Sequence, residues 1–263
     1  MKKVYIKRFL SLLVLCMFLG AGIGGFPVIA AADITSSFTD PAFLAYVREV
    51  AGKPTEPIYD TDIVDVANLE LNSKGIKSLA GIEHFVNLKQ LDCFYNQLTT
   101  LPTLPDGLED INVLNNNITS IPASALPSSL LALRCSYNEL TALPELPAGL
   151  LILACSDNKL TALPTLPAGL SLLDCGNNKL TGLDVTGLAS LGYIDCRFNN
   201  MTDRSDVKGF TGEWSDDWPI KYYQFSPQNS TAEPAWWESL PSILQWILRI
   251  FFFGWIWMEP GDL

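Results

Sequence analysis

The sequence predicts an α/β repeat solenoid with short parallel strands on its concave face, a mostly extended or coil convex side and a small helical N-terminal cap. The main observation is a repeat: LKQLDCFYNQLTTLPTLPDG from Leu88 recurs as LLALRCSYNELTALPELPAG from Leu130 and as LLILACSDNKLTALPTLPAG from Leu150. Related units begin at Val66, Leu108, Leu170 and Leu191, which gives seven turns of about 20–22 residues. Turns of this length bury a continuous core when they stack on one another.

Each unit opens with a short strand, because apolar and polar side chains alternate there. In the unit that begins at Leu88, we expect Leu91 and Cys93 to point into the solenoid and Asp92 and Phe94 to point out. An asparagine follows each strand, and the series is Asn96, Asn116, Asn138, Asn158, Asn178 and Asn199. An amide side chain can satisfy main-chain groups of neighbouring turns, which cost about 1–3 kcal/mol each when they are buried unpaired.

The second half of several units carries paired prolines, at 101–105, 143–147 and 163–167. Two prolines in five residues exclude a regular helix and favour an extended back wall. Gly107 and Gly149 follow such segments and permit the bend into the next strand.

Five cysteines occupy the same position of successive units: Cys93, Cys135, Cys155, Cys175 and Cys196. Stacked thiols suggest either a metal ladder or a disulfide framework. However, each replaces a core residue that is Leu71 or Val113 in other units, and an odd number suits a disulfide set poorly. We therefore expect buried thiols that act as small hydrophobic side chains, and neither a metal nor a cofactor.

The pattern L-x-x-L-x-L-x-x-N-x-L is that of the leucine-rich repeat. The LPxLPxxL units resemble those of bacterial secreted leucine-rich effectors, including the ubiquitin-ligase type. The block from FTDPAFLAYVREVAGKP to IKSLAGIEHFVNLKQLDC is similar to the cap and first repeats of internalin-type surface proteins. Together these resemblances cover roughly residues 38–229. The ligase type needs a large helical catalytic domain after the repeats, and only about thirty residues follow here, so we do not expect that activity.

The two ends of the repeat array have their own character. Residues 1–32 read as an export signal, since a cationic start precedes an apolar stretch and Ala30 and Ala32 suit cleavage before Asp33. Residues 33–65 are the predicted helical cap, with Asp40 and Pro41 at the helix start and Gly52 at its end. The solenoid then spans 66–210, and 211–229 are the C-terminal cap, with aromatic side chains that plug the last turn.

The tail, residues 230–263, is rich in tryptophan and almost wholly apolar from 242 to 258. Seventeen residues are at the lower limit of a membrane span, and Arg249 lies near their middle. One helical face carries the polar residues Glu238, Ser242, Gln245 and Arg249. This pattern favours a helix that contacts a membrane interface or a hydrophobic partner through residues 236–258. A spanning helix and a helix packed back on the solenoid are the alternatives.

Composition excludes some classes of function. The chain has 28 acidic and 17 basic residues, and four of the basic ones lie in the leader, so that 13 remain beyond it. Such an acidic surface repels phosphate, which argues against nucleic-acid binding. His84 is the only histidine, and no nucleophile motif accompanies it, so we do not expect an enzyme. We expect Asp174 and Asp195, on adjacent strands, to belong to a solvated acidic face.

The outward-pointing side chains of the strands are the candidate binding residues. Their first lane changes from polar to apolar along the solenoid, and Ile152, Leu172 and Tyr193 should form an exposed patch edged by Asp174 and Asp195. The predicted apolar anchors are Phe94, Leu114, Ile152, Leu172 and Tyr193, and the residues predicted to set polarity are Asp92, Asp174, Asp195 and Arg197. The alternative is that the apolar lane receives the tail helix.

These observations predict an exported, extracellular or surface protein, membrane-associated through its tail, that binds a protein or a glycan through its sheet. A structural envelope component without a specific ligand and a secreted effector toxin are the alternative hypotheses.

Overall fold

A computed structural model describes residues 31–214, 223–225 and 228. The chain divides into two units, Met1–Ala32 and Asp33–Leu263. Of the predicted leader, only Ala31 and Ala32 belong to the described residues, and the predicted tail lies outside them. In the described part of the chain, no helix has the length and apolar character needed to cross a membrane.

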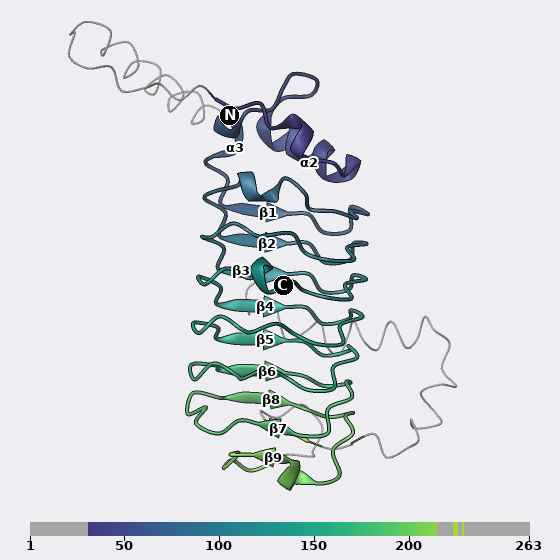
Figure 1. Cartoon of the computed structure of the whole chain (residues 1–263), viewed down its shortest axis with the longest axis vertical. Coiled ribbons are helices and arrows are strands. Elements are labelled where there is room, and N and C mark those ends of the chain that lie inside the picture. Colours follow the sequence, from purple (N-terminus) through teal and green to yellow (C-terminus); the bar gives the residue numbers. More distant parts are fainter. Residues whose placement is uncertain (1–30, 215–222, 226–227, 229–263) are drawn as a thin grey trace, which may run out of the picture. The chain divides into compact units, whose positions relative to one another are not determined.

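The core of the fold is a parallel sheet of eight strands: seven come one from each turn, stacked on the next (Figure 1), and the eighth, β10, follows the repeats. In order across the sheet, these are β1 (Asn68–Glu70), β2 (Gln90–Asp92), β3 (Asp110–Asn112), β4 (Ala132–Arg134), β5 (Ile152–Ala154), β6 (Leu172–Asp174), β8 (Tyr193–Asp195) and β10 (Tyr223–Gln224). Pairing from β1 to β8 keeps equivalent repeat positions opposite one another; for example, Ile152 pairs with Leu172 and Ala154 with Asp174. The predicted parallel-strand solenoid is confirmed.

Three residues after each of the strands β1 to β6 and β8, one residue has a left-handed backbone, and in every turn but the first it directly precedes the asparagine of the series. These residues are Ser73, Tyr95, Asn115, Tyr137, Asp157, Asn177 and Phe198, with φ between 49° and 56°. None is glycine, although this conformation costs about 1–2 kcal/mol for other residues. The sharp bend turns the chain back toward the core and explains why the strands are only three residues long.

The asparagine series points into the solenoid, as predicted. Asn158 is typical: its Nδ2 donates to the carbonyls of Cys135 (3.0 Å), Cys155 (3.1 Å) and Ser156 (3.0 Å), and its Oδ1 accepts from the amide of Leu140 (2.9 Å). One side chain thus satisfies main-chain groups of its own turn and of the preceding turn. The ladder joins the turns by buried hydrogen bonds in addition to apolar packing.

The N-terminal cap consists of a 3₁₀ turn, η1 (Thr35–Ser37), and two helices, α2 (Pro41–Ala51) and α3 (Asp60–Ile63). As predicted, Asp40 caps α2 by accepting from the amides of Ala42 and Phe43, and Gly52 ends it with φ 66°. The other oxygen of Asp40 accepts from the amides of Lys77 and Ser78 in the first turn. A single buried carboxylate thereby fastens the cap to the solenoid.

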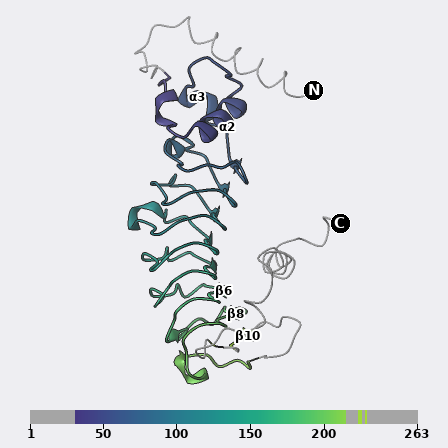
Figure 2. The same cartoon turned by 90° about the vertical axis from the view of Figure 1, so that its right-hand side faces the viewer.

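The side of the turns away from the sheet is mostly coil, as the prolines predict, and Figure 2 shows the turns from the side. It also carries the 3₁₀ turns η2 (Ile82–His84), η3 (Ala123–Ala125) and η4 (Arg204–Asp206), and a second parallel pair, β7 (Leu183–Asp184) with β9 (Val207–Lys208). β7 replaces the proline segment in the one late turn that reads TGLDVTGL.

Aromatic side chains cover the last turn, where the sequence predicts a plug. Phe210 lies 4.1 Å from Trp214 and 5.1 Å from Tyr223 between ring centroids, and Trp214 lies 5.5 Å from Phe225. Trp218 and Tyr222, which are part of the same prediction, lie outside the described residues. The described aromatics shield the apolar end of the core from water.

Candidate functional site

The outward side chains of the eight-stranded sheet form the sheet face, the name we use from here. Strand register places Asn68, Gln90, Asp110, Ala132, Ile152, Leu172 and Tyr193 in its first lane, and Glu70, Asp92, Asn112, Arg134, Ala154, Asp174 and Asp195 in its second. Both lanes agree with the sequence prediction. Their side chains point out because residues of one strand alternate between core and surface.

An apolar patch lies in the second half of the sheet face, around β5, β6 and β8. The predicted anchors Ile152, Leu172 and Tyr193 lie on adjacent strands and are half-buried. Two further leucines, which the sequence analysis did not select, are more exposed: Leu131 at 40% and Leu151 at 42%. The amide of Leu151 donates to the carbonyl of Leu131 (2.8 Å), so these two leucines lie on adjacent turns, one position before the first lane. We call these five residues the apolar patch.

A signal for the two leucines is visible in the repeats. Leu131 and Leu151 stand at the position that Lys89 and Glu109 occupy in the two preceding turns, where these charged residues form an ion pair of 2.7 Å. A change from a charged pair to two leucines at one surface position is the type of local change that predicts a contact surface.

The predicted binding residues form two groups and not one. Asp92, Phe94 and Leu114 lie at the first end of the sheet, on or next to β2 and β3. The other predicted residues lie on or next to β5, β6 and β8, and β4 separates the groups. Arg134 of β4 forms an ion pair with Asp110, so a charged pair stands between the two groups.

The first group is partly enclosed. Phe94 packs edge-on against Tyr95, with ring centroids 5.6 Å apart, and both Phe94 and Leu114 are half-buried. Gln90 Nε2 donates to Asp92 Oδ2 at 3.0 Å. Burial raises the pKa of Asp92, and the neighbouring carboxylate of Asp110 adds to the effect.

The second group contains a buried ion pair. Arg197 Nη2 donates to Asp195 Oδ2 at 2.6 Å and Arg197 Nε donates to Asp195 Oδ1 at 3.0 Å, while Asp195 is only 4% exposed. This forked geometry is the strong form of a carboxylate–guanidinium contact. The two charges offset each other, so this pair contributes shape and fixed dipoles more than net charge.

Asp174 lies next to this ion pair, but its carboxylate has a different environment. Its Oδ2 accepts from the hydroxyl of Ser156 (2.9 Å), which also contacts the hydroxyl of Ser136 (3.0 Å). Among the described residues, no basic side chain forms an ion pair with Asp174. Burial, with the charge of Asp195 as the second cause, raises the pKa of Asp174 to about 7. The expectation of a solvated acidic face is therefore wrong for Asp195, which is buried, whereas Asp174 is half-buried.

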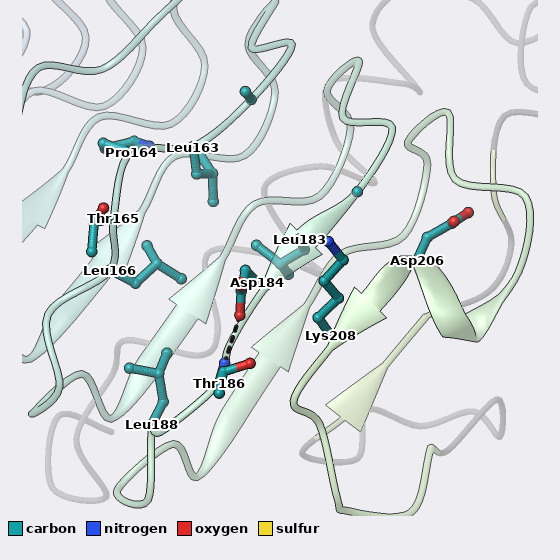
Figure 3. A pocket seen from close by; sticks show the side chains of 12 residues that line it. Leu163, Pro164, Thr165, Leu166, Leu183, Asp184, Thr186, Leu188, Asp206 and Lys208 are labelled. Atoms are coloured by element: carbon teal, nitrogen blue, oxygen red, sulfur yellow. Dashed lines mark hydrogen bonds between the residues drawn. The ribbon is translucent and has the colours of Figure 1, made fainter.

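A pocket of about 480 Å³ lies outside the sheet face (Figure 3). Leu163, Leu166, Leu183 and Leu188 give it apolar walls, and Asp184, Asp206 and Lys208 lie at its polar side. The hydroxyl and amide of Thr186 hydrogen-bond to Asp184 and hold the pKa of that carboxyl below its usual range. None of the predicted binding residues lines this pocket.

The stacked cysteines are buried free thiols in the apolar core, as predicted. Burial raises the pKa of Cys93 and of Cys135 to about 12, so neither forms a thiolate near neutral pH. Within the described ranges, no group of three or more His, Cys, Asp or Glu side chains is placed to hold a metal ion. His84 contacts the hydroxyl of Ser37 at 2.9 Å and thus links the first turn to the cap.

Several solved structures are similar to this chain, whereas no family model matches it. YopM, a leucine-rich effector protein of Yersinia pestis, is 37% identical over 51% of this chain and 38% of its own length, with a TM-score of 0.48. A Shigella effector leucine-rich repeat domain is 28% identical over 54% of this chain and 73% of that chain (TM-score 0.44). Internalin C2 of Listeria monocytogenes is 22% identical over 69% and 94% (TM-score 0.47).

The repeat consensus, the parallel ladder and the buried asparagine series are features of this molecule itself. Together they define its fold as that of a leucine-rich repeat protein, and the structures similar to it are those of bacterial leucine-rich repeat proteins.

Proposed function

We propose that this protein is an exported, non-catalytic binding protein that recognises a protein or glycan partner through its sheet face and associates with the cell envelope through residues 236–258. The observation that carries the proposal is the apolar patch. Two of its leucines remain about two-fifths exposed on adjacent turns, beside half-buried Ile152 and Leu172. Contiguous exposed apolar side chains on a rigid surface are typical of an interaction site.

The surroundings of the patch support recognition over nonspecific adhesion. Arg134 with Asp110 on one side, and Arg197 with Asp195 on the other, fix polar groups at its borders. An apolar centre with a polar border is the usual anatomy of a protein interface. Stacked turns keep this surface stiff, so little conformational freedom is lost when a partner binds.

The test replaces two patch residues with charged ones. Ile152→Glu together with Leu172→Glu should reduce capture of the native partner, measured by crosslinking and pull-down from the source cells, by at least about tenfold. The matched control is Val50→Glu with Val86→Glu, two exposed apolar residues away from the sheet face. Equal capture by the patch variant and the control variant, at wild-type thermal stability, contradicts the proposal.

Export and envelope association rest on composition, because the residues that carry them lie outside the described ranges. The cationic, apolar and small-residue order of 1–32 supports export. Deletion of 236–263 should release the protein from the membrane fraction of the source cells. Membrane fractionation of the truncated protein at the wild-type level contradicts this part of the proposal.

A further inference from the structure

We propose that Tyr95, Asn115 and Tyr137 bind an uncharged β-1,4-linked glycan, with the two tyrosine rings stacked on alternate sugars. We call these three residues the aromatic rim. They lie beside Phe94 and Leu114, the first group of predicted binding residues, and away from the apolar patch. This inference rests on the proposed function, to which it adds a class of ligand and a second surface.

The rim residues hold the left-handed position of three consecutive turns, with φ of 55°, 54° and 56°. Their amides donate to the carbonyls of Leu114, Ser136 and Ser156 in the next turn, each at 3.0 Å. Because the backbone and the register are the same in each turn, the three side chains leave the stack in the same direction. Two later members of this series meet side by side, since Asn177 Nδ2 donates to Asp157 Oδ1 at 2.6 Å.

The spacing of the rings matches a particular polymer. Tyr95 and Tyr137 lie two turns apart, with Asn115 on the turn between them. Neighbouring strands of a sheet lie about 4.8 Å apart, so two turns span about 9.6 Å. This length is close to one disaccharide of an extended β-1,4-linked glycan, in which successive sugars are turned by half a rotation and alternate sugars present the same face. A ring on every second turn therefore meets the same face of every second sugar.

Both tyrosine rings offer surface for stacking. Each is half-buried, so part of each side chain is in contact with water. Phe94 packs edge-on against Tyr95, with ring centroids 5.6 Å apart and 78° between the ring planes, and this contact restricts the orientation of the tyrosine ring. The face of an aromatic ring carries partial negative charge. The axial C–H groups of a β-linked sugar carry partial positive charge, so a sugar ring stacks on that face.

The polar groups near the rings suit hydroxyl groups and favour an uncharged ligand. Asn115 lies between the rings and is half-buried, and the exposed amides of Gln97 and Asn117 follow two positions after the first two rim residues. The equivalent position of the third turn is Glu139, whose charge is compensated by an ion pair with Lys159. Amide groups both donate to and accept from sugar hydroxyls. The rim thus offers hydrogen bonds in both directions without an uncompensated charge at these positions.

The experiment titrates the full chain with cellotetraose and with chitotetraose, and isothermal titration calorimetry measures binding. Maltotetraose is the matched probe, because it has the same sugars as cellotetraose but α-1,4 linkages, which curve the chain away from a straight row of rings. We expect saturable binding of at least one β-1,4-linked tetrasaccharide and none of maltotetraose. The corresponding β-1,4-linked disaccharide should bind at least about tenfold more weakly, because it reaches only one of the two rings.

The variants assign the binding to the rim. Tyr137→Ala should weaken it at least about tenfold through loss of one stacked ring. Tyr59→Ala, which removes a half-buried tyrosine of the N-terminal cap, should leave it unchanged. The sharper test moves one ring by one turn: Asn115→Tyr together with Tyr137→Asn keeps the composition but places the two rings on adjacent turns. Tyrosine and asparagine both occur at this left-handed position in the chain itself, so the exchange adds no backbone strain. It should weaken binding as much as Tyr137→Ala does.

Absence of saturable binding of both β-1,4-linked tetrasaccharides, or equal binding of maltotetraose, overturns the aromatic rim. Binding that survives at wild-type strength in the folded exchange variant or in Tyr137→Ala also overturns it. The oligosaccharides need no native partner, so these results are independent of the pull-down in the proposed function. Loss of partner capture in the patch variant, together with no oligosaccharide binding by the wild type, rejects the aromatic rim and retains the apolar patch.

Discussion

The inward and outward positions of the same strands follow different rules. Inward, the turns repeat almost one set of side chains: leucine or isoleucine, then cysteine or valine, then asparagine. Outward, the first lane runs from Asn68 through Asp110 to Leu172 without any repetition. Inward positions are nearly identical because each turn packs on a copy of itself, whereas outward positions face no copy and are free to differ.

The difference extends to how polar groups are satisfied. Every polar atom of Asn158 has a partner within the stack. On the outward side, among the described residues, the carboxylate of Asp174 forms no ion pair and the amide oxygen of Gln224 has no hydrogen-bond donor. The molecule thus completes its hydrogen bonds inside the solenoid and leaves them incomplete at one end of the sheet face. The regular inward positions stabilise the stack, and the irregular outward positions are those to which we assign recognition in the proposed function.

The largest expected effect comes from breaking the inward pattern. Asn158→Ala removes one acceptor and two donor hydrogens, and it leaves the amide of Leu140 buried without a partner. We expect a loss of about 3 kcal/mol in the free energy of unfolding, because several buried groups lose their hydrogen bonds together. Urea denaturation followed by circular dichroism measures it.

Asn117→Ala is the control, because Asn117 directly follows Asn116 of the series but is exposed. Its effect should stay within about 0.5 kcal/mol. Equal losses in the two variants contradict the view that the buried asparagine series stabilises the stack.

A smaller effect, with a characteristic pH dependence, is expected on the outward side. The folded-state pKa of Asp174 is about 7, compared with an ordinary value of 3.8, so the folded chain holds this proton more tightly than the unfolded chain does. Its contribution to stability is therefore present at low pH and declines as the pH rises from about 4 to about 7. Asp174→Asn removes this decline.

At pH 8, Asp174→Asn should be more stable than the wild type by about 2 kcal/mol, roughly half of what the full pKa difference gives, because Asp174 is partly exposed to water. At pH 4, the two proteins should differ little. Melting temperatures across this pH range measure the effect. A variant that is less stable than the wild type at pH 8 contradicts the assignment of the raised pKa to Asp174.

The sequence predicted the architecture well, for a physical reason. A period of about 20 residues fixes the turn, and alternation within the strand fixes which side each residue faces, so the lanes of Ile152 and Asp174 follow without coordinates. The helix caps at Asp40 and Gly52 also follow from local chemistry. These features depend only on residues close in sequence or on equivalent positions of the repeat.

The candidate site was less predictable, because it depends on details of packing. The pKa of Asp174 depends on how deeply the carboxylate is buried and on Asp195, 21 positions away, neither of which a repeat pattern reports. The acceptor of Gln224 belongs to β10, which has no repeat signature at all. The left-handed residues escaped prediction for another reason: none of them is glycine, the residue that normally signals this backbone.

The smallest expected effect on stability concerns these left-handed residues, which lie between the outward and the inward positions of each turn. Ser73 is exposed, has φ 56°, and uses only its amide to bond the carbonyl of Phe94 (3.0 Å). Ser73→Gly keeps that bond and removes a left-handed strain of about 1–2 kcal/mol, but it also makes the unfolded chain more flexible. A net gain of about 0.5 kcal/mol in the free energy of unfolding should result.

Thr99→Gly is the control, at an exposed position without positive φ, and should instead lose about 0.5–1 kcal/mol in the free energy of unfolding. If urea denaturation shows both variants to be destabilised alike, then the strand ends store no backbone strain, and the turn geometry comes from the asparagine ladder alone.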